Sequence, residues 1–94
     1  MKIKVIPTTL RLVETSNSNI KISPNPTNGY CLIDMGETYS KVSVIISDLN
    51  GKVIQSIKYN ESKVLNLNLN EPAGVYFVKV ATGNEETLIR LIKD

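Results

Sequence analysis

Apolar and polar residues alternate with a period of two along most of this 94-residue chain. The clearest example runs from Val64 to Asn70, where Leu65, Leu67 and Leu69 alternate with asparagines. Successive side chains of a β-strand point to opposite faces of the sheet, so this segment predicts a strand with its leucines inward. No window of helical length carries an apolar stripe with a 3.6-residue period. The sequence therefore predicts an all-β chain.

Turn-forming residues separate the alternating segments about every ten residues. Asn50-Gly51 predicts a two-residue type I′ hairpin turn, because both residues tolerate a positive φ angle. Segments 71–74 and 83–84 mark further turns. The other predicted strands are 41–49, with Val42, Val44 and Ile46 on one face, 52–59, 75–80 and 86–93. Strands at this spacing are typical of a β-sandwich or barrel, and we favour an immunoglobulin-like antiparallel β-sandwich of about seven strands.

Two features of this pattern have alternative explanations. Tyr76, at the start of its strand, is either the tyrosine corner of an immunoglobulin-like sandwich or a half-buried aromatic residue, and the second is more common. Segments 75–78 and 88–92 carry apolar side chains on both faces. Either both strands are central in a two-layer core, or one face is a docking patch. We favour the core, because packing explains most apolar side chains.

The composition excludes several classes of function. The 11 basic and 9 acidic residues are interspersed and give a net charge of +2, so we expect no nucleic-acid binding. The chain has no histidine and a single cysteine, Cys31. It therefore offers no Ser-His-Asp or Cys-His nucleophile and no Cys/His zinc site. Cys31 lies in an apolar run and is expected to be a small buried residue. We expect no enzyme activity, no metal and no cofactor.

The N-terminal part of the chain differs from the rest. Residues 1–12 hold no apolar run of signal-peptide length, and residues 14–19 are polar turn-formers that predict a linker. Residues 3–13 are a strand of this domain, a remnant of a preceding domain, or a tail, and Pro7 argues against a central strand. We divide the chain into an N-terminal extension and linker from a parent protein, 1–19, and a β-sandwich domain, 20–94.

Pro24-Asn25-Pro26 fixes two φ angles and removes two backbone donors, which a central strand does not tolerate. It predicts a rigid lead into the next strand and a defined surface feature. In sequence order it is followed by Gly29, by Asp48 to Lys52, by Gly74 to Lys79, and by a C-terminus with Thr87, Arg90, Leu91, Ile92 and Lys93. This series is similar to the successive motifs of the type IX (Por) secretion-system C-terminal sorting domain, type A, of Bacteroidetes. The likeness covers 20–94, about four-fifths of the chain.

The resemblance implies a non-catalytic module at the end of a larger exported protein. Such a module directs its covalently linked N-terminal cargo to the type IX translocon, with its shuttle and sortase-like protease components. The protein passes through the periplasm to the cell surface or the extracellular space. The protease cuts upstream of the sandwich, for surface attachment or release.

The resemblance also implies site residues. The recognition residues are Pro24, Asn25, Pro26, Gly29, Asp48, Gly51, Lys52, Gly74, Tyr76, Lys79, Arg90 and Lys93. Arg90 stands where that family often has lysine, which keeps the charge but changes the hydrogen-bond geometry. The expected cleavage region, judged by its low tendency to be buried, is Ser16, Asn17, Ser18, Asn19 and Ile20. We expect Lys93 to be reachable from solvent, and a weak homodimer through an edge strand is a further expectation.

A function of a different class stays open beside this one. The chain could be a carbohydrate- or surface-binding β-sandwich accessory domain of an extracellular enzyme. Such sites usually present a platform of aromatic side chains, and this chain has four tyrosines, one phenylalanine and no tryptophan. Binding to a glycan array separates the two functions.

Overall fold

The computed structural model describes residues 19–83 and 85–94. The predictions for residues 1–18, with the alternatives for 3–13 and most of the linker, lie outside the described residues, as does Asn84. The strands are β1 (Lys21–Ser23), β2 (Tyr30–Tyr39), β3 (Val42–Ser47), β4 (Val53–Tyr59), β5 (Ser62–Asn68), β6 (Gly74–Ala81) and β7 (Glu86–Lys93). Every strand predicted within the described range is present, and its ends differ from the prediction by at most two residues.

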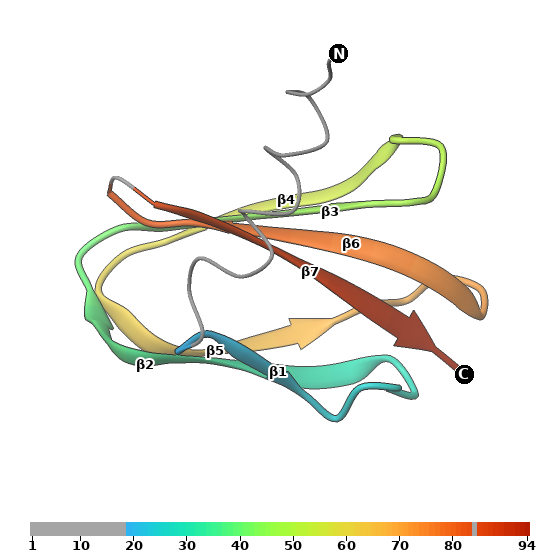
Figure 1. The fold of residues 1–94 in the computed structure, drawn as a ribbon, viewed down its shortest axis with the longest axis horizontal. Coiled ribbons are helices and arrows are strands. Elements are labelled where there is room, and N and C mark those ends of the chain that lie inside the picture. The colour runs from blue at the N-terminus through green and yellow to red at the C-terminus, as the bar shows by residue number, and fades with distance from the viewer. Residues whose placement is uncertain (1–18, 84) are drawn as a thin grey trace, which may run out of the picture.

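The strands form two antiparallel sheets that pack face to face (Figure 1). The smaller sheet has the order β1-β2-β5, and the larger has the order β4-β3-β6-β7. The predicted all-β sandwich is confirmed. The placement of β4 beside β3 resembles that of the extra strands in variable-type immunoglobulin domains. The described part of the chain contains no helix that could cross a membrane.

The core lies between the two sheets and is built from the inward half of each alternating strand. Leu65, Leu67 and Leu69 are at most 2% exposed, as their alternation with asparagine predicts. Burying one such side chain stabilises the fold by about 1.5–3 kcal/mol. The inward row of β3, namely Val42, Val44 and Ile46, is equally buried. Cys31 is fully buried, as expected. Burial raises the pKa of its thiol, and a hydrogen bond with Thr27 lowers that pKa by a smaller amount.

The hairpin between β3 and β4 differs from the predicted type I′ turn. Gly51 N–H donates to the carbonyl of Asp48 at 3.0 Å, and only Gly51 of the turn has a positive φ angle, +85°. Asn50 keeps a negative φ angle, so a two-residue type I′ turn is not formed. The Asp48 N–H also donates to the carbonyl of Lys52. This geometry matches the longer hairpin loop in which a glycine follows a type I turn.

The two strands with apolar residues on both faces occupy different positions in the larger sheet. β6 is central, between β3 and β7, as expected for a core strand. The same expectation for β7 is wrong, because β7 is an edge strand of that sheet. Its outer face leaves Leu88 half-buried and Ile92 36% exposed.

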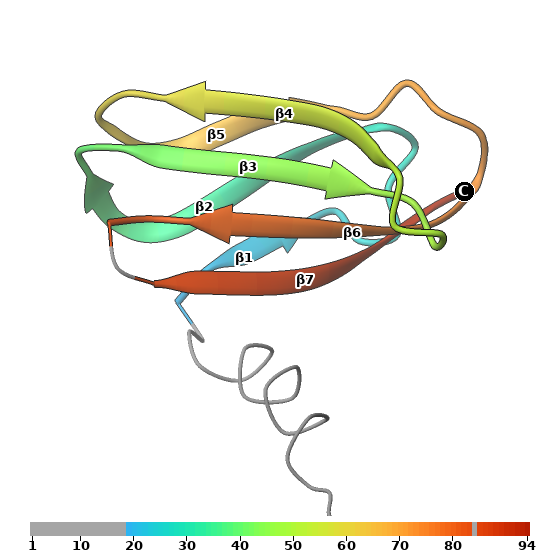
Figure 2. The ribbon, with the colours of Figure 1, turned by 90° about the horizontal axis from the view of Figure 1, so that it is seen from above.

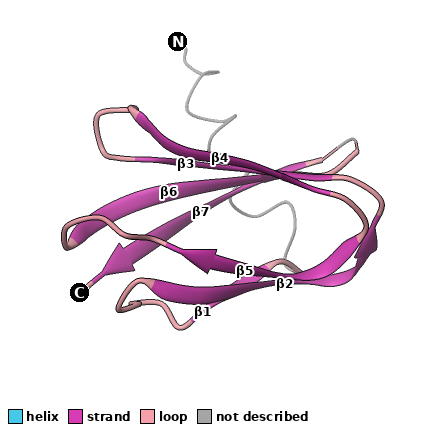
Figure 3. Ribbon diagram, turned by 180° about the vertical axis from the view of Figure 1, so that it is seen from behind, coloured by secondary structure: helices cyan, strands magenta, loops and turns pink. Residues whose placement is uncertain are grey.

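Side chains of β4 cover the free edge of β5. Gln55 Nε2 donates to the carbonyl of Asn68 at 2.9 Å, and the Tyr59 hydroxyl donates to the carbonyl of Asn66 at 3.3 Å. These bonds link the edge strands of the two sheets, which lie in separate layers in Figure 3. This side of the sandwich is therefore partly closed by side chains.

The antiparallel arrangement places alternate connections at opposite ends of the sandwich (Figure 2). One end holds segments 24–29, 48–52 and 69–73 together with the C-terminus of β7, and we call it the motif end. The other end holds the start of β1 and the β2–β3, β4–β5 and β6–β7 connections, and we call it the linker end. The motifs singled out in the sequence lie mostly at the first of these.

Candidate functional site

The side chain of Asn25 connects the Pro-Asn-Pro segment to the C-terminal strand. Its Nδ2 donates to the carbonyl of Arg90 at 2.8 Å, and its Oδ1 accepts the N–H of Ile92 at 3.0 Å. One amide thus pairs with the free edge of β7 much as a neighbouring strand would. The flanking residues Pro24 and Pro26 are exposed. The two segments lie more than 60 residues apart in sequence, so this contact exists only in the folded domain.

Thr27 continues the same contact with its backbone. Its N–H donates to the carbonyl of Ile92 at 2.8 Å, and its carbonyl accepts the N–H of Asp94 at 2.9 Å. The side-chain hydroxyl, in a residue 1% exposed, donates to the carbonyl of Tyr30 and accepts the N–H of Gly29. Thr27 therefore holds the C-terminus, the 24–29 turn and β2 in one arrangement. This role of Thr27 could not be predicted from the sequence, because a threonine in a turn gives no local signal of it.

Gly29 lies at the centre of the motif end and has little space around it. Its φ angle is +129°, and an added Cβ would lie 3.0 Å from the carbonyl oxygen of Leu69 and 3.4 Å from Cε of Lys93. The Leu69 N–H donates to the Gly29 carbonyl at 2.6 Å. A side chain at this position would therefore separate the 24–29 turn from the end of β5 and from Lys93.

Lys93 folds back over Gly29 instead of extending into solvent. Its ammonium group donates to the carbonyl of Glu71, in the connection between β5 and β6. The side chain is half-buried, so the expectation of a solvent-reachable Lys93 holds only in part. The geometry gives Lys93 a structural task, which is to join β7 to the 69–73 segment.

The Asp48–Lys52 turn is held by the carboxylate of Asp48. Its Oδ1 accepts the N–H groups of Asn50 and Lys52, each at 2.9 Å. These bonds leave Leu49 at the tip of the turn with 66% of its surface exposed. Leu49 is the most exposed of the large apolar side chains that the structure describes.

Tyr76 adopts the tyrosine-corner arrangement. Its hydroxyl donates to the carbonyl of Pro72 at 2.6 Å, four residues upstream, and the side chain is 6% exposed. This resolves the two explanations in favour of the corner. Burial raises the pKa of the hydroxyl, and the charges of Glu71 and Asp48 raise it further. The corner therefore fixes the turn that leads into Gly74 and β6.

Two predicted recognition residues lie away from this cluster. Lys79 and Arg90 project from the outer face of the larger sheet, where Lys79 pairs with Leu88 and Arg90 pairs with Phe77. The carbonyl of Arg90 belongs to the Asn25 contact, but its side chain is exposed. The motif end thus unites the other predicted recognition residues.

The described part of the predicted cleavage region, Asn19 and Ile20, lies at the linker end. Ile20 is 6% exposed and belongs to the core, so its expected low burial is wrong. Asn19 is exposed and lies against Gly36 of β2, where an added Cβ would come within 3.1 Å of Asn19 Cβ. Ser16, Asn17 and Ser18 lie outside the described residues.

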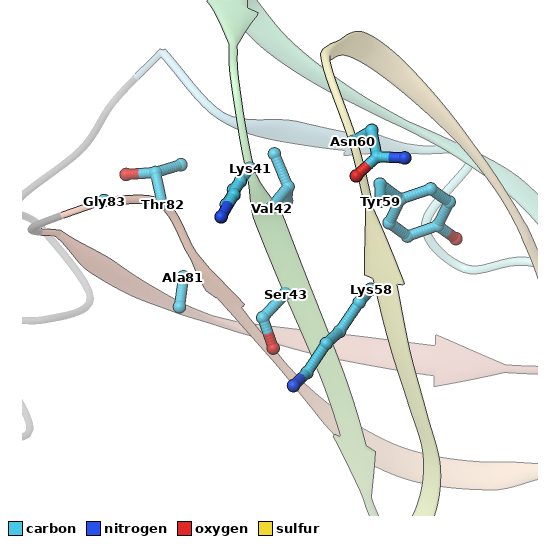
Figure 4. Close-up of a pocket in the computed structure, with 9 residues that line it drawn as sticks. All are labelled: Lys41, Val42, Ser43, Lys58, Tyr59, Asn60, Ala81, Thr82 and Gly83. Atoms are coloured by element: carbon cyan, nitrogen blue, oxygen red, sulfur yellow. The ribbon is translucent and has the colours of Figure 1, made fainter.

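A shallow pocket of about 440 Å³ also lies at the linker end (Figure 4). Lys41 and Lys58 line it with Tyr59, and the lining contains no acidic residue. Burial raises the pKa of the Tyr59 hydroxyl, which is engaged with the carbonyl of Asn66. One engaged tyrosine does not provide the aromatic platform that carbohydrate binding usually requires. The described residues include no group of three His, Cys, Asp or Glu side chains that could hold a metal.

Comparison with known proteins identifies a family for most of the chain. The family described as "secretion system C-terminal sorting domain" matches residues 21–94. No curated protein matches the chain. The matching family is not an enzyme family, and its domains act together with the type IX secretion machinery on an N-terminal cargo. The chain belongs to this family of C-terminal sorting domains, the signals for type IX secretion across the outer membrane to the cell surface or the extracellular space.

Proposed function

We propose that the motif end of the sandwich is the surface by which the type IX translocon recognises this chain. The observation that carries the proposal is the convergence of four separate sequence motifs on one end of the fold. Asn25 and Thr27 hold the C-terminus of β7, Lys93 reaches the 69–73 segment, and Tyr76 anchors the following turn. Only the folded domain assembles this surface.

The geometry also supports a separation between the recognition surface and the cargo. The N-terminal cargo joins the domain before Asn19, at the linker end, while the motif end faces the other way. A translocon component can therefore bind the motif end without contacting the cargo. We infer that a sortase-like protease acts at the opposite end and cuts within 16–19, and the burial of Ile20 supports a cut upstream of that residue. The domain itself performs no catalysis.

In this scheme the module reaches the periplasm with a cargo whose own signal lies upstream. Shuttle and protease components then release the cargo or attach it at the cell surface. Arg90 and Lys79, on the outer face of the larger sheet, supply a second, basic contact area beside the motif end.

The test is export of a reporter that carries a signal peptide at its N-terminus and residues 20–94 at its C-terminus. In a type IX host the reporter should reach the medium or the cell surface, and in a translocon-null strain it should stay in the periplasm. Asn25→Ala should reduce export, whereas Asn60→Ala, an exposed asparagine at the linker end, serves as the matched control. Periplasmic retention of the unmodified reporter in the type IX host would refute the proposal. Glycan-array binding by such a retained domain would favour the carbohydrate-binding alternative.

A further inference from the structure

The free edge of β7 divides into a covered half and an open half. Backbone groups of alternate residues point away from β6, because N–H and C=O of one residue in an antiparallel strand face the same side. The carbonyl of Arg90, both groups of Ile92 and the N–H of Asp94 point this way, and Asn25 and Thr27 bind them. The covered half of the edge therefore begins at the carbonyl of Arg90.

The open half is the segment from Glu86 to the N–H of Arg90. By the same alternation, the N–H and C=O of Leu88 point away from β6. They have no hydrogen-bond partner among residues 19–83 and 85–94. An exposed stretch of unpaired strand edge is a template for a further strand. The Asn25 contact limits the length of any strand that can add here.

The side chains of this segment are complementary to themselves. Glu86, Leu88 and Arg90 all lie on the outer face of the larger sheet, and both charged side chains are exposed. If a second copy pairs antiparallel with its Leu88 opposite Leu88, Glu86 lies opposite the partner's Arg90. The same pair forms again on the other side of the two-fold axis. Opposite charges directly across a strand pair stabilise it, and like charges destabilise it.

The other strand edges lack this combination. β1 has three residues, and two carbonyls on the edge of β5 are taken by Gln55 and Tyr59. β4 carries a single charged residue, Lys58, so antiparallel pairing with its own copy offers no ion pair. Only at β7, among the described strands, do an open backbone edge and opposite charges occur together.

We propose that β7 is a homotypic docking edge through which two copies of this chain form a two-fold dimer. The strands pair over Glu86–Arg90 with the axis at Leu88, and the two larger sheets join into one continuous sheet. The Leu88 residues exchange main-chain hydrogen bonds, and each Glu86 faces the partner's Arg90. The motif ends and linker ends stay outside the contact, so two cargo-bearing copies can associate through it. This inference does not depend on the proposed translocon contact.

Self-association is measured on the full 94-residue chain by analytical ultracentrifugation, up to about 1 mM protein. The wild type should show a monomer–dimer equilibrium. Glu86→Arg and Arg90→Glu should each weaken it at least tenfold, because each variant places like charges opposite one another. An equimolar mixture of the two variants should form the heterodimer with near wild-type affinity, since all of its cross-strand pairs are again opposite in charge. Lys63→Glu on β5, also an exposed charge change, should leave the equilibrium unchanged.

A monomeric wild type throughout this range would overturn the proposal, as would a mixture that stays monomeric while the wild type dimerises. A second measurement needs no substitution. Amide exchange at Leu88 and Arg90 should slow as protein concentration rises, while exchange at Lys58 on β4 stays constant. If protection at Lys58 rises with protein concentration and protection at Leu88 does not, the contact lies at the edge of β4, and this result would also contradict the proposal.

Discussion

Replacing Asn25 with alanine removes the side chain that holds the end of β7. The Nδ2 bond to the Arg90 carbonyl and the Oδ1 bond from the Ile92 N–H are both lost. A protein hydrogen bond contributes about 0.5–1.5 kcal/mol net, and both of these are exposed, so the pair is worth about 1–2 kcal/mol. That energy corresponds to a rise of about 5- to 30-fold in the local opening of this end.

Amide hydrogen exchange followed by NMR measures this opening directly. In Asn25→Ala, exchange at the Ile92 amide should accelerate by that factor, because the acceptor that it has among the described residues is gone. The Ile89 amide, which faces β6, should keep its wild-type rate. The rate at Ile89 separates local opening from a general loss of stability.

Asn25→Asp is the matched variant. A carboxylate still accepts the Ile92 N–H but cannot donate to the Arg90 carbonyl. Ile92 should therefore stay protected in the aspartate variant while it loses protection in the alanine variant. Equal exchange at Ile92 in wild type and Asn25→Ala would refute the assignment of this contact.

Three further predictions concern the motif end. Gly29→Ala should lower the free energy of unfolding in urea by about 1–3 kcal/mol, because it forces a side chain into a left-handed backbone near Leu69. A Cβ added at Gly83 meets no atom within 4 Å, so Gly83→Ala should change the free energy of unfolding by less than about 0.5 kcal/mol. Equal losses in the two variants would contradict this reasoning. The pKa of the Tyr76 hydroxyl is raised in the folded state, so the neutral side chain stabilises the fold. This stabilisation is complete below about pH 10 and is lost as the pH rises through the folded-state pKa. The unfolding free energy should therefore fall less steeply above pH 10 in Tyr76→Phe than in wild type, and parallel profiles would count against it. Removal of residues 90–94 should abolish reporter export, since it deletes the groups bound by the 24–29 segment; normal export would oppose this.

The strands and the core were predictable because they follow from local patterns. Alternation fixes which residues of β5 face inward, and Leu65, Leu67 and Leu69 are buried accordingly. Asn50-Gly51 correctly indicated a hairpin, but its detail depended on the Asp48 carboxylate, which holds the backbone of a longer turn. The dipeptide alone therefore indicates a hairpin but not the type of its turn.

The organisation of the motif end could not be read from the sequence, because its contacts join distant segments. The bonds of Asn25 to β7 span 65 and 67 residues, and the bond of Lys93 to Glu71 spans 22. A basic residue before the C-terminus suggests an exposed charge, but the nearby carbonyl of Glu71 attracts its ammonium group. Similarly, the apolar residues of β7 suggested a central strand, whereas the capping of its edge by Asn25 and Thr27 permits an edge position.

The central claim is that recognition takes place at the motif end and not at the linker end. Photo-crosslinking during reporter export in a type IX host tests this claim. The crosslinking residue replaces either Leu49, which is exposed at the tip of the β3–β4 turn, or Ser40, which is exposed at the opposite end. The account predicts adducts with a translocon component from position 49 and none from position 40. Adducts from position 40 alone would contradict it.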